Sequence, residues 1–366
     1  MSRIVIYINS MTASGGIERV VSNLMFMWSE KHDLILLTKD AGDSFYPLPD
    51  KIKKSSTENQ LILDMTNRAQ RIAATTSNLV TSRRVLAKQL DEIKPDYIYV
   101  TSPFNALEVW LTGRSNRKKL IVSEHGSFFG YNCVYTAIKR LIYPSVYCIS
   151  VPNKTDTVIY RAWGCRAMYM PHPVTFFEST GNALNSKVLL NIGRLTPDKR
   201  QSLLVDMWAK VTDKNGWCLW IVGEGELKQE LHDKIKKMGL DDCVRLLGAT
   251  KDIASVYSQA SAFAFSSIHE GFGMVLLEAM SFGIPCVSFD CPSGPRDVII
   301  EGVNGFLIDD DDEDAFIETL NQIVHMTQED LRVLGSGAKA FVDAWDNKEI
   351  SHLWDLVFCN EEIGEA

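Results

Sequence analysis

Short apolar segments separated by longer polar and amphipathic segments recur along the whole chain. The apolar segments are rich in Val, Ile, Leu and Phe, and most lack the alternation of strands that keep one face in water. This pattern predicts buried parallel strands that alternate with helices. The expected strands are residues 3–9, 33–38, 97–101, 120–123, 147–151, 168–170, 187–192, 217–222, 244–247, 260–265, 285–290 and 306–308.

Two longer segments have helical character. Residues 331–358 have helical character, whereas residues 41–60 are polar and expected to be irregular. Residues 67–93 form the other long helix, with an apolar face expected from Ile72, Leu79, Val80, Leu86 and Leu90. The same helix carries the cations Arg68, Arg71, Arg83, Arg84 and Lys88.

The length of 366 residues exceeds one ordinary core and suits two domains. A polar segment at residues 174–185 is the expected link between them. We therefore expect an α/β protein with a first domain at residues 1–178, a second at 179–345 and a final helix at 346–366.

Composition excludes several classes of protein. The hydrophobic fraction of 46% and the charged fraction of 23% are ordinary for a globular protein. No apolar segment reaches the roughly 18 residues that cross a bilayer, and the strand-like N-terminus predicts no signal peptide. The eight cysteines are scattered without a C-x-x-C pair, which predicts reduced thiols in a cytosol and no zinc site.

The net charge of −8 is unevenly distributed. Residues 1–180 hold 22 Lys and Arg against 15 Asp and Glu, whereas residues 181–366 hold 16 against 31. A basic half on an acidic chain indicates an anionic partner for that half. Because it contains no nucleic-acid-binding motif, an anionic membrane surface or a lipid diphosphate fits better. The cationic helix is then either a solvated surface or an interfacial helix.

The segment SSIHEGFGMVLLEAM carries the most specific chemistry. It follows an expected strand, and a helix-forming run starts at Met274. The N–H groups of Gly273, Met274 and Val275 are therefore expected at a helix N-terminus, where an anion binds. Glu270 and Glu278 flank this position, and carboxylates accept hydrogen bonds from hydroxyl groups. A phosphate site between two hydroxyl acceptors predicts a sugar nucleotide.

The sequence EGFGMVLLE resembles the E-x7-E motif of retaining glycosyltransferases with the GT-B fold, most closely those of glycosyltransferase family 4. The resemblance covers nearly the whole chain. It implies two Rossmann-like domains that face a central cleft and a nucleotide sugar held mainly by the second domain. It also implies a C-terminal helix that crosses back to the first domain.

Other strand ends of the second half resemble the family as well. Arg194 and Lys199 stand in GRLTPDK, which resembles the family's diphosphate-binding segment, although Arg200 replaces a glycine that often follows the lysine. Arg can hold a diphosphate through two hydrogen bonds, and Lys supplies a point charge. In the family the glycine turn at Gly223 lines the nucleotide pocket, and we expect the base near Gly248. No residue separates uracil from guanine or adenine.

Two strand ends of the first half match further family positions. Gly15 and Gly16 precede a helix without the G-x-G-x-x-G pattern of a dinucleotide site. They mark either a tight turn or, as in the resembling family, a loop near the donor phosphate or the acceptor. His125 follows the strand at 120–123, and a histidine at this position in the family faces the donor sugar. A structural histidine is the alternative.

The resemblance implies a retaining transferase that moves a hexose or N-acetylhexosamine from a UDP-sugar to a lipid-linked sugar in O-antigen, capsule or lipopolysaccharide synthesis. No metal or other cofactor is expected, since Arg194, Lys199 and the helix dipole can neutralise the leaving diphosphate. Glu278 is expected to hold the ribose, and Glu270 either sugar hydroxyls or developing positive charge. His125 would orient the sugar.

The expected location is the cytoplasmic face of the membrane, as a peripheral protein without a nucleic-acid partner. Two alternatives remain. A sugar-nucleotide epimerase of the same fold would turn over the donor with no acceptor, and a non-catalytic sensor would bind the donor without turnover.

Overall fold

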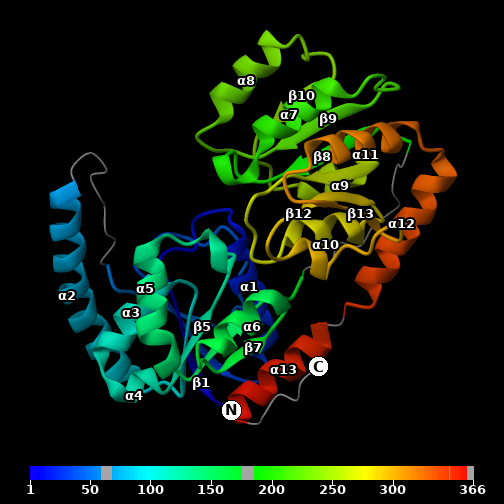
Figure 1. Cartoon of the computed structure of the whole chain (residues 1–366). Helices are drawn as coiled ribbons and strands as arrows, with labels where there is room; N and C mark the ends of the chain where they lie inside the picture. Colours follow the sequence, from blue (N-terminus) through cyan, green and yellow to red (C-terminus); the bar gives the residue numbers. More distant parts are fainter. Residues whose placement is uncertain (59–67, 175–184, 346, 361–366) are drawn as a thin grey trace. The chain divides into compact units, whose positions relative to one another are not determined.

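The computed structural model describes residues 1–58, 68–174, 185–345 and 347–360, with the backbone alone for residues 68–78. The chain divides into two compact units (Figure 1). Unit 1 comprises Met1–Pro173 and the chain from Asn347 onward, and unit 2 comprises Val174–Asp346. The expected boundary between residues 178 and 179 lies outside the described residues.

Unit 1 contains a parallel sheet covered by helices. Its strands are β1 (Arg3–Ile8), β2 (Asp33–Thr38), β3 (Lys53–Ser56), β4 (Tyr97–Val100), β5 (Leu120–Ser123), β6 (Cys148–Val151) and β7 (Ala167–Tyr169). They lie in the order β3-β2-β1-β4-β5-β6-β7, and every neighbouring pair is parallel. Its helices are α1 (Gly16–Ser29), α2 (Arg68–Ile93), α3 (Pro103–Thr112), α4 (Arg114–Arg117), α5 (Cys133–Ile142), α6 (Lys154–Ala162) and α13 (Asn347–Cys359), with 3-10 turns η1 (Phe128–Gly130) and η2 (Tyr143–Ser145).

Strand β3 lies in the segment that we expected to be irregular, so that expectation was wrong. It pairs with β2 in parallel, but its sequence KKSS is polar and its side chains are largely exposed. An edge strand needs only one hydrogen-bonded neighbour and no buried apolar face, so it leaves no hydrophobic pattern. The apolar face expected on α2 also needs correction, because Leu86 and Leu90 are buried whereas Val80 is 50% exposed.

Helix α13 packs on unit 1. Trp354 meets Trp28 of α1 edge-on, with 4.9 Å between ring centroids. The hydroxyl groups of Tyr97 and Tyr147 donate to the carbonyls of Phe358 and Val357 at 2.8 and 2.7 Å. These contacts attach the C-terminal helix to α1, to β4 and to the residue before β6.

Unit 2 repeats the architecture with a six-stranded sheet. Its strands are β8 (Val188–Ile192), β9 (Cys218–Val222), β10 (Val244–Leu247), β11 (Ala262–Phe265), β12 (Cys286–Asp290) and β13 (Gly305–Asp309). Their order is β10-β9-β8-β11-β12-β13, again with parallel pairs. Its helices are α7 (Gln201–Lys210), α8 (Lys228–Lys237), α9 (Ile253–Ser258), α10 (Met274–Ser281), α11 (Glu313–His325) and α12 (Gln328–Asp343), with 3-10 turns η3 (Pro197–Lys199) and η4 (Pro295–Asp297).

The sheet of unit 2 buries both faces. Ala262 and Ala264 of β11 join a core with α7, α8 and α11, whereas Phe263 and Phe265 join a core with α9, α10 and α12. Burial on both sides explains why the strand sequence is continuously apolar. The expected α/β fold with two Rossmann-like halves is confirmed.

The helical segment expected over residues 331–358 consists of two separate helices. Helix α12 ends at Asp343 in unit 2, and α13 begins at Asn347 in unit 1. The chain passes from one unit to the other between them, so one continuous helix would not serve both cores.

Candidate functional site

The strand order of unit 2 reverses at β8, which lies between β9 and β11. Open α/β sheets bind ligands outside the carboxyl ends of their strands at such a reversal. The loop after β8 contains Arg194 and Lys199, and the loop after β11 contains Glu270. The topology therefore brings together predicted donor-site residues that are far apart in sequence.

Hydrogen bonds join these two loops. Ser266 Oγ donates to the Lys199 carbonyl at 2.8 Å, and the Ile268 N–H donates to the Asp198 carbonyl at 2.9 Å. Lys199 Nζ forms an ion pair with Glu270, and the two side chains are only 19% and 15% exposed. The cation predicted for the diphosphate and the carboxylate predicted for the sugar are thus direct neighbours.

Asp198 and Arg194 lie in the same loop as Lys199. Burial raises the pKa of Asp198, but the Thr196 hydroxyl and the Lys199 charge outweigh burial and leave that pKa below its ordinary value. Arg194 is exposed and makes no ion pair within the described part of the chain. Gln201, fully buried, donates to the Arg194 carbonyl at 3.0 Å and fixes the loop backbone. The site therefore contains one paired and one unpaired cation.

Arg200 occupies a position that favours glycine. It begins α7 in the left-handed conformation, with φ of 52°. An L-residue with a side chain is strained there by about 1 kcal/mol. Its guanidinium contacts Asp310 and Asp311 at 3.3 and 2.6 Å, which offsets the strain. The departure from the family pattern thus has a local explanation, since the arginine is held by the acidic segment before α11.

The glycine turn after β9 is required by packing. A Cβ atom on Gly223 would lie 2.0 Å from the Gly193 carbonyl oxygen, and one on Gly225 would lie 2.3 Å from the Leu195 carbonyl oxygen. A Cβ on Gly248, after β10, would lie 2.9 Å from Glu224 Oε1. The backbone contacts explain Gly223 and Gly225 without a ligand, whereas the contact at Gly248 is with a flexible carboxylate and does not require glycine. Contact of Gly223 and Gly248 with a nucleotide stays a prediction.

The helix that was expected to begin at Met274 is α10. Gly273 precedes it in the left-handed conformation with φ of 85°, and the first N–H groups of a helix lack intrahelical acceptors. A third loop, after β12, reaches this place. Ser293 Oγ donates to the Glu270 carbonyl at 3.0 Å, and a Cβ on Gly294 would lie 2.9 Å from the Phe272 carbonyl oxygen.

Glu278 lies one turn into α10 and is 3% exposed. The Tyr257 hydroxyl donates to Glu278 Oε2 at 2.9 Å. Tyr257 is itself fixed by stacking on Phe282, with 5.4 Å between ring centroids. Sequence reasoning missed Tyr257, because a single aromatic residue in a short helix carries no motif.

Unit 1 places His125 after β5, at the carboxyl edge of its own sheet. His125 stacks on His172, with 4.8 Å between centroids and 19° between planes. The Nε2 atom of His125 is buried and has no hydrogen-bond partner among the described residues. Burial lowers the pKa of His125 to about 3, and burial together with His125 lowers that of His172. Both imidazoles are therefore neutral at pH 7.

His172 is a site residue that sequence reasoning missed. It follows β7, and the argument from strand ends that selected His125 would also have selected it. Beneath His125, the neighbouring Glu124 is 1% exposed and accepts hydrogen bonds from Lys139 and Tyr143. This buried network fixes the backbone that carries His125.

Gly15 and Gly16 begin α1 without conformational need for glycine. Neither has a positive φ. A Cβ on Gly16 would meet nothing within 4 Å, and one on Gly15 would meet only the flexible Glu18 carboxylate. The tight-turn explanation is therefore weak, and close approach by a ligand remains as a reason for both glycines.

The predicted acceptor cations lie on α2. Arg83, Arg84 and Lys88 are exposed, and Lys88 lies 4.0 Å from Glu92. The side chains of Arg68 and Arg71 lie outside the described residues.

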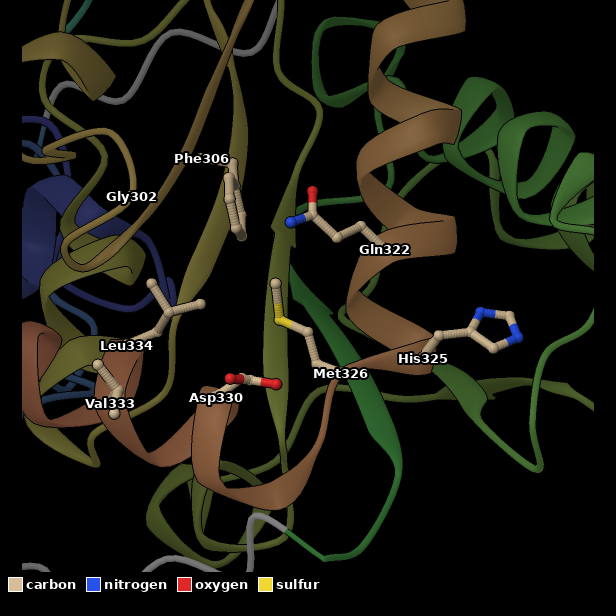
Figure 2. A pocket seen from close by; sticks show the side chains of 8 residues that line it. All are labelled: Gly302, Phe306, Gln322, His325, Met326, Asp330, Val333 and Leu334. Atoms are coloured by element: carbon tan, nitrogen blue, oxygen red, sulfur yellow. The ribbon is translucent and has the colours of Figure 1, made fainter.

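An open groove of about 680 Å³ lies elsewhere in unit 2 (Figure 2). Phe306, Met326, Val333 and Leu334 line it, near the start of β13 and the end of α11. That is the amino edge of the sheet, so the groove is separate from the loops that carry the predicted donor residues.

A metal-binding cluster and a membrane-spanning helix are both absent from the described segments. No group of three or more His, Cys, Asp or Glu residues there could hold a metal ion. No helix in the same segments is both long and apolar enough to cross a membrane.

Comparisons with known proteins identify similar glycosyltransferases. Residues 175–341 match the family described as Glycosyl transferases group 1. The chain is 28% identical over 342 residues to the amylovoran biosynthesis glycosyltransferase AmsD of Erwinia amylovora, covering 90% of this chain and 92% of that protein. It is 27% identical over 322 residues, 85% of this chain and 86% of the relative, to the GalNAc-alpha-(1->4)-GalNAc-alpha-(1->3)-diNAcBac-PP-undecaprenol alpha-1,4-N-acetyl-D-galactosaminyltransferase of Campylobacter jejuni.

A solved structure shows the same fold. TarM of S. aureus, in complex with fondaparinux, alpha-GlcNAc-glycerol and UDP, gives a TM-score of 0.81 at 15% identity, over 98% of this chain and 100% of that chain. The expected GT-B fold is confirmed.

Proposed function

Because residues 175–341 match the family described as Glycosyl transferases group 1, we propose that the chain is a glycosyltransferase that moves a hexose or N-acetylhexosamine from a UDP-sugar to a lipid-linked saccharide, with retention of configuration. The proposed product belongs to a bacterial surface polysaccharide, such as O-antigen, capsule or lipopolysaccharide. The names of the two relatives, a polysaccharide enzyme and an enzyme acting on an undecaprenol-linked sugar, support this assignment.

The convergence of three loops at the N-terminus of α10 is the observation that carries the donor assignment. Arg194, in the loop after β8, is exposed and has no ion pair among the described residues. Lys199 of the same loop is in contact with Glu270. Two cations and a helix N-terminus suit a diphosphate. Uridine is our choice of base because TarM has been solved with UDP.

The carboxylates and histidine have separate proposed roles. Glu278, oriented by Tyr257, would accept hydrogen bonds from the ribose hydroxyls. Glu270 would accept from the sugar hydroxyls or stabilise developing positive charge. His125, neutral and fixed against His172, would orient the transferred sugar.

We propose that the protein needs no resident metal or other cofactor. Departure of UDP places negative charge on the diphosphate, and Arg194, Lys199 and the dipole of α10 would stabilise that charge. Activity that persists after dialysis against EDTA supports this proposal, and activity restored only by a divalent cation contradicts it.

The acceptor and location are proposed from unit 1. The exposed cations Arg83, Arg84 and Lys88 suit an anionic bilayer or the diphosphate of a lipid-linked sugar. The protein would then act as a peripheral enzyme on the cytoplasmic face, without a nucleic-acid partner.

Transfer of labelled sugar tests the proposal directly. Wild-type protein should move sugar from a UDP-sugar to a polyprenyl-diphosphate saccharide, and α-linked product from an α-linked donor would show retention. Glu270→Gln should lower kcat by at least about 10-fold without weakening donor binding. Glu329→Gln, whose side chain is 69% exposed and pairs with Arg332 on α12, is the matched control. Donor turnover without acceptor would instead indicate an epimerase, and binding without turnover a sensor.

A further inference from the structure

Helix α5 buries a cation and exposes apolar residues. Lys139 is 1% exposed, and its ammonium group donates to Glu124 and to the Tyr160 hydroxyl, both at 2.7 Å. Val134 and Leu141 are 63% and 66% exposed. Ile142 packs in the core, as is usual for an amphipathic helix, but the solvent-facing side of α5 also carries apolar residues.

The exposed apolar residues form one stripe. Val134 and Leu141 are seven residues apart, so they lie on the same side of the helix, with the partly exposed Ile138 between them. Phe129 of the preceding turn η1 is 52% exposed and Tyr135 is 36% exposed. We refer to Phe129, Val134, Tyr135, Ile138 and Leu141 as the α5 stripe.

The exposed charges of residues 103–145, the segment that contains the α5 stripe, have one sign. The acidic residues of this segment are Glu108 and Glu124, which are 0% and 1% exposed. Arg114, Lys118 and Arg140 in the same segment are exposed. Helix α3 contacts both α5 and α2 (Figure 1), and α2 adds the exposed Arg83, Arg84 and Lys88 together with the exposed Asp91 and Glu92.

We propose that the α5 stripe inserts into the headgroup region of an anionic bilayer. This inference rests on the proposed function, because the bilayer is the surface that holds the proposed lipid-linked acceptor. Apolar side chains bordered by arginine and lysine match the acyl boundary and the phosphates of such a surface. A second copy of the chain is a poor occupant, since a twofold contact through the stripe would place the exposed cations of both copies, among them Arg140, at one interface. The stripe begins at η1, three residues after His125, so insertion would hold the His125 loop close to the lipid surface.

Vesicle sedimentation tests the proposal. Val134→Ser together with Leu141→Ser should weaken binding to phosphatidylglycerol-containing vesicles by at least about 10-fold, because two apolar side chains no longer leave water. Val333→Ser is the matched control, since Val333 is 62% exposed on α12 of unit 2. Equal binding of wild type and the double variant would overturn the proposal, as would equal loss in the control.

A fluorescent label tests insertion at the helix itself. Cys133, the first residue of α5, and Cys359 of α13 are both exposed. In a Cys359→Ser background, an environment-sensitive dye on Cys133 should shift its emission to the blue with anionic vesicles, whereas a dye on Cys359 in Cys133→Ser should not. No shift at Cys133, or a shift caused by self-association without lipid, would contradict the proposal.

UDP binding by the same variants separates this inference from the proposed function. The double variant Val134→Ser and Leu141→Ser should bind UDP as wild type does, because both residues belong to unit 1. Normal UDP binding with unaltered vesicle binding would refute the α5 stripe alone. Absence of UDP binding in wild type would refute the proposed function.

Discussion

At the scale of single residues, the ion pair between Lys199 and Glu270 links the two proposed halves of the donor site. A diphosphate would compete with Glu270 for the lysine, and the released carboxylate would be free to accept hydrogen bonds from the sugar. Binding of donor and orientation of its sugar would then be coupled through one lysine.

Replacement of Lys199 by alanine should weaken UDP binding by about 10- to 100-fold, because a hydrogen bond to a charged group contributes about 1.5–3 kcal/mol. Lys210→Ala is the control, since that lysine is 56% exposed at the end of α7. Calorimetric titration with UDP measures both. Equal affinity of Lys199→Ala and wild type would return the lysine to a purely structural role.

The two stacked histidines make stability depend on pH. Burial lowers the pKa of His125 from 6.5 to about 3, and that of His172 is lowered as well. Below pH 6.5 the unfolded chain therefore binds protons that the folded chain does not. The free energy of unfolding should fall as pH decreases from 6.5 toward 3, by about 1.4 kcal/mol per pH unit for each histidine.

Urea unfolding at several pH values checks this prediction. His172→Asn should reduce the slope below pH 6.5, and His232→Asn, whose side chain is 62% exposed, should leave it unchanged. The same slope in wild type and His172→Asn would show that the buried pair does not control acid stability.

The sequence identified residues that belong to a motif and missed those that act through packing. Lys199 and Glu270 could be predicted because charged residues at fixed spacings followed apolar strands. Tyr257 could not be separated from ordinary residues, because its role depends on a contact with Glu278 that only the folded chain defines. His172 could have been selected by its place after a strand, but its stacking on His125 is defined only in the folded chain.

At the scale of elements, the two glycine turns have different causes. Gly223 is required by the chain itself, since a Cβ there would lie 2.0 Å from the Gly193 carbonyl oxygen. Gly16 has open space around it and an ordinary φ. The second glycine is therefore the one that packing leaves unexplained, and approach by a ligand would account for it.

Gly16→Ala should keep or slightly raise the thermal midpoint, because alanine is favoured over glycine in a helix by about 1 kcal/mol. Transfer activity should fall if a ligand approaches this turn. Gly223→Ala should instead lower the thermal midpoint, which calorimetry would show. Full activity in Gly16→Ala would exclude ligand contact as the reason for this glycine.

Strands and helices were largely predictable, and the exceptions have physical reasons. Parallel strands buried on both faces are largely apolar, so a strand such as β5 could be located to the residue. Strand β3 has no buried face and left no pattern. The break between α12 and α13 follows from the division into two units, and it was expected only from the resemblance, which implied a separate final helix.

At the scale of the whole molecule, each unit has its own sheet and its own residues at the carboxyl edge of that sheet. Unit 2 contains the cations, the helix N-terminus and both motif glutamates, so nucleotide binding should depend on unit 2. Unit 1 contains His125, Gly16 and the α5 stripe, so effects on the acceptor and on lipid should arise there. Each variant described above should therefore change the step that is assigned to its own unit.

Calorimetric binding of UDP, GDP and ADP, each with magnesium and with EDTA, directly tests the proposed donor site of unit 2. We expect UDP to bind in either condition, and we expect Arg194→Ala combined with Lys199→Ala to abolish binding. Failure of all three nucleotides to bind, or unchanged UDP affinity in the double variant, would contradict the assignment of the carboxyl edge of unit 2 as the donor site.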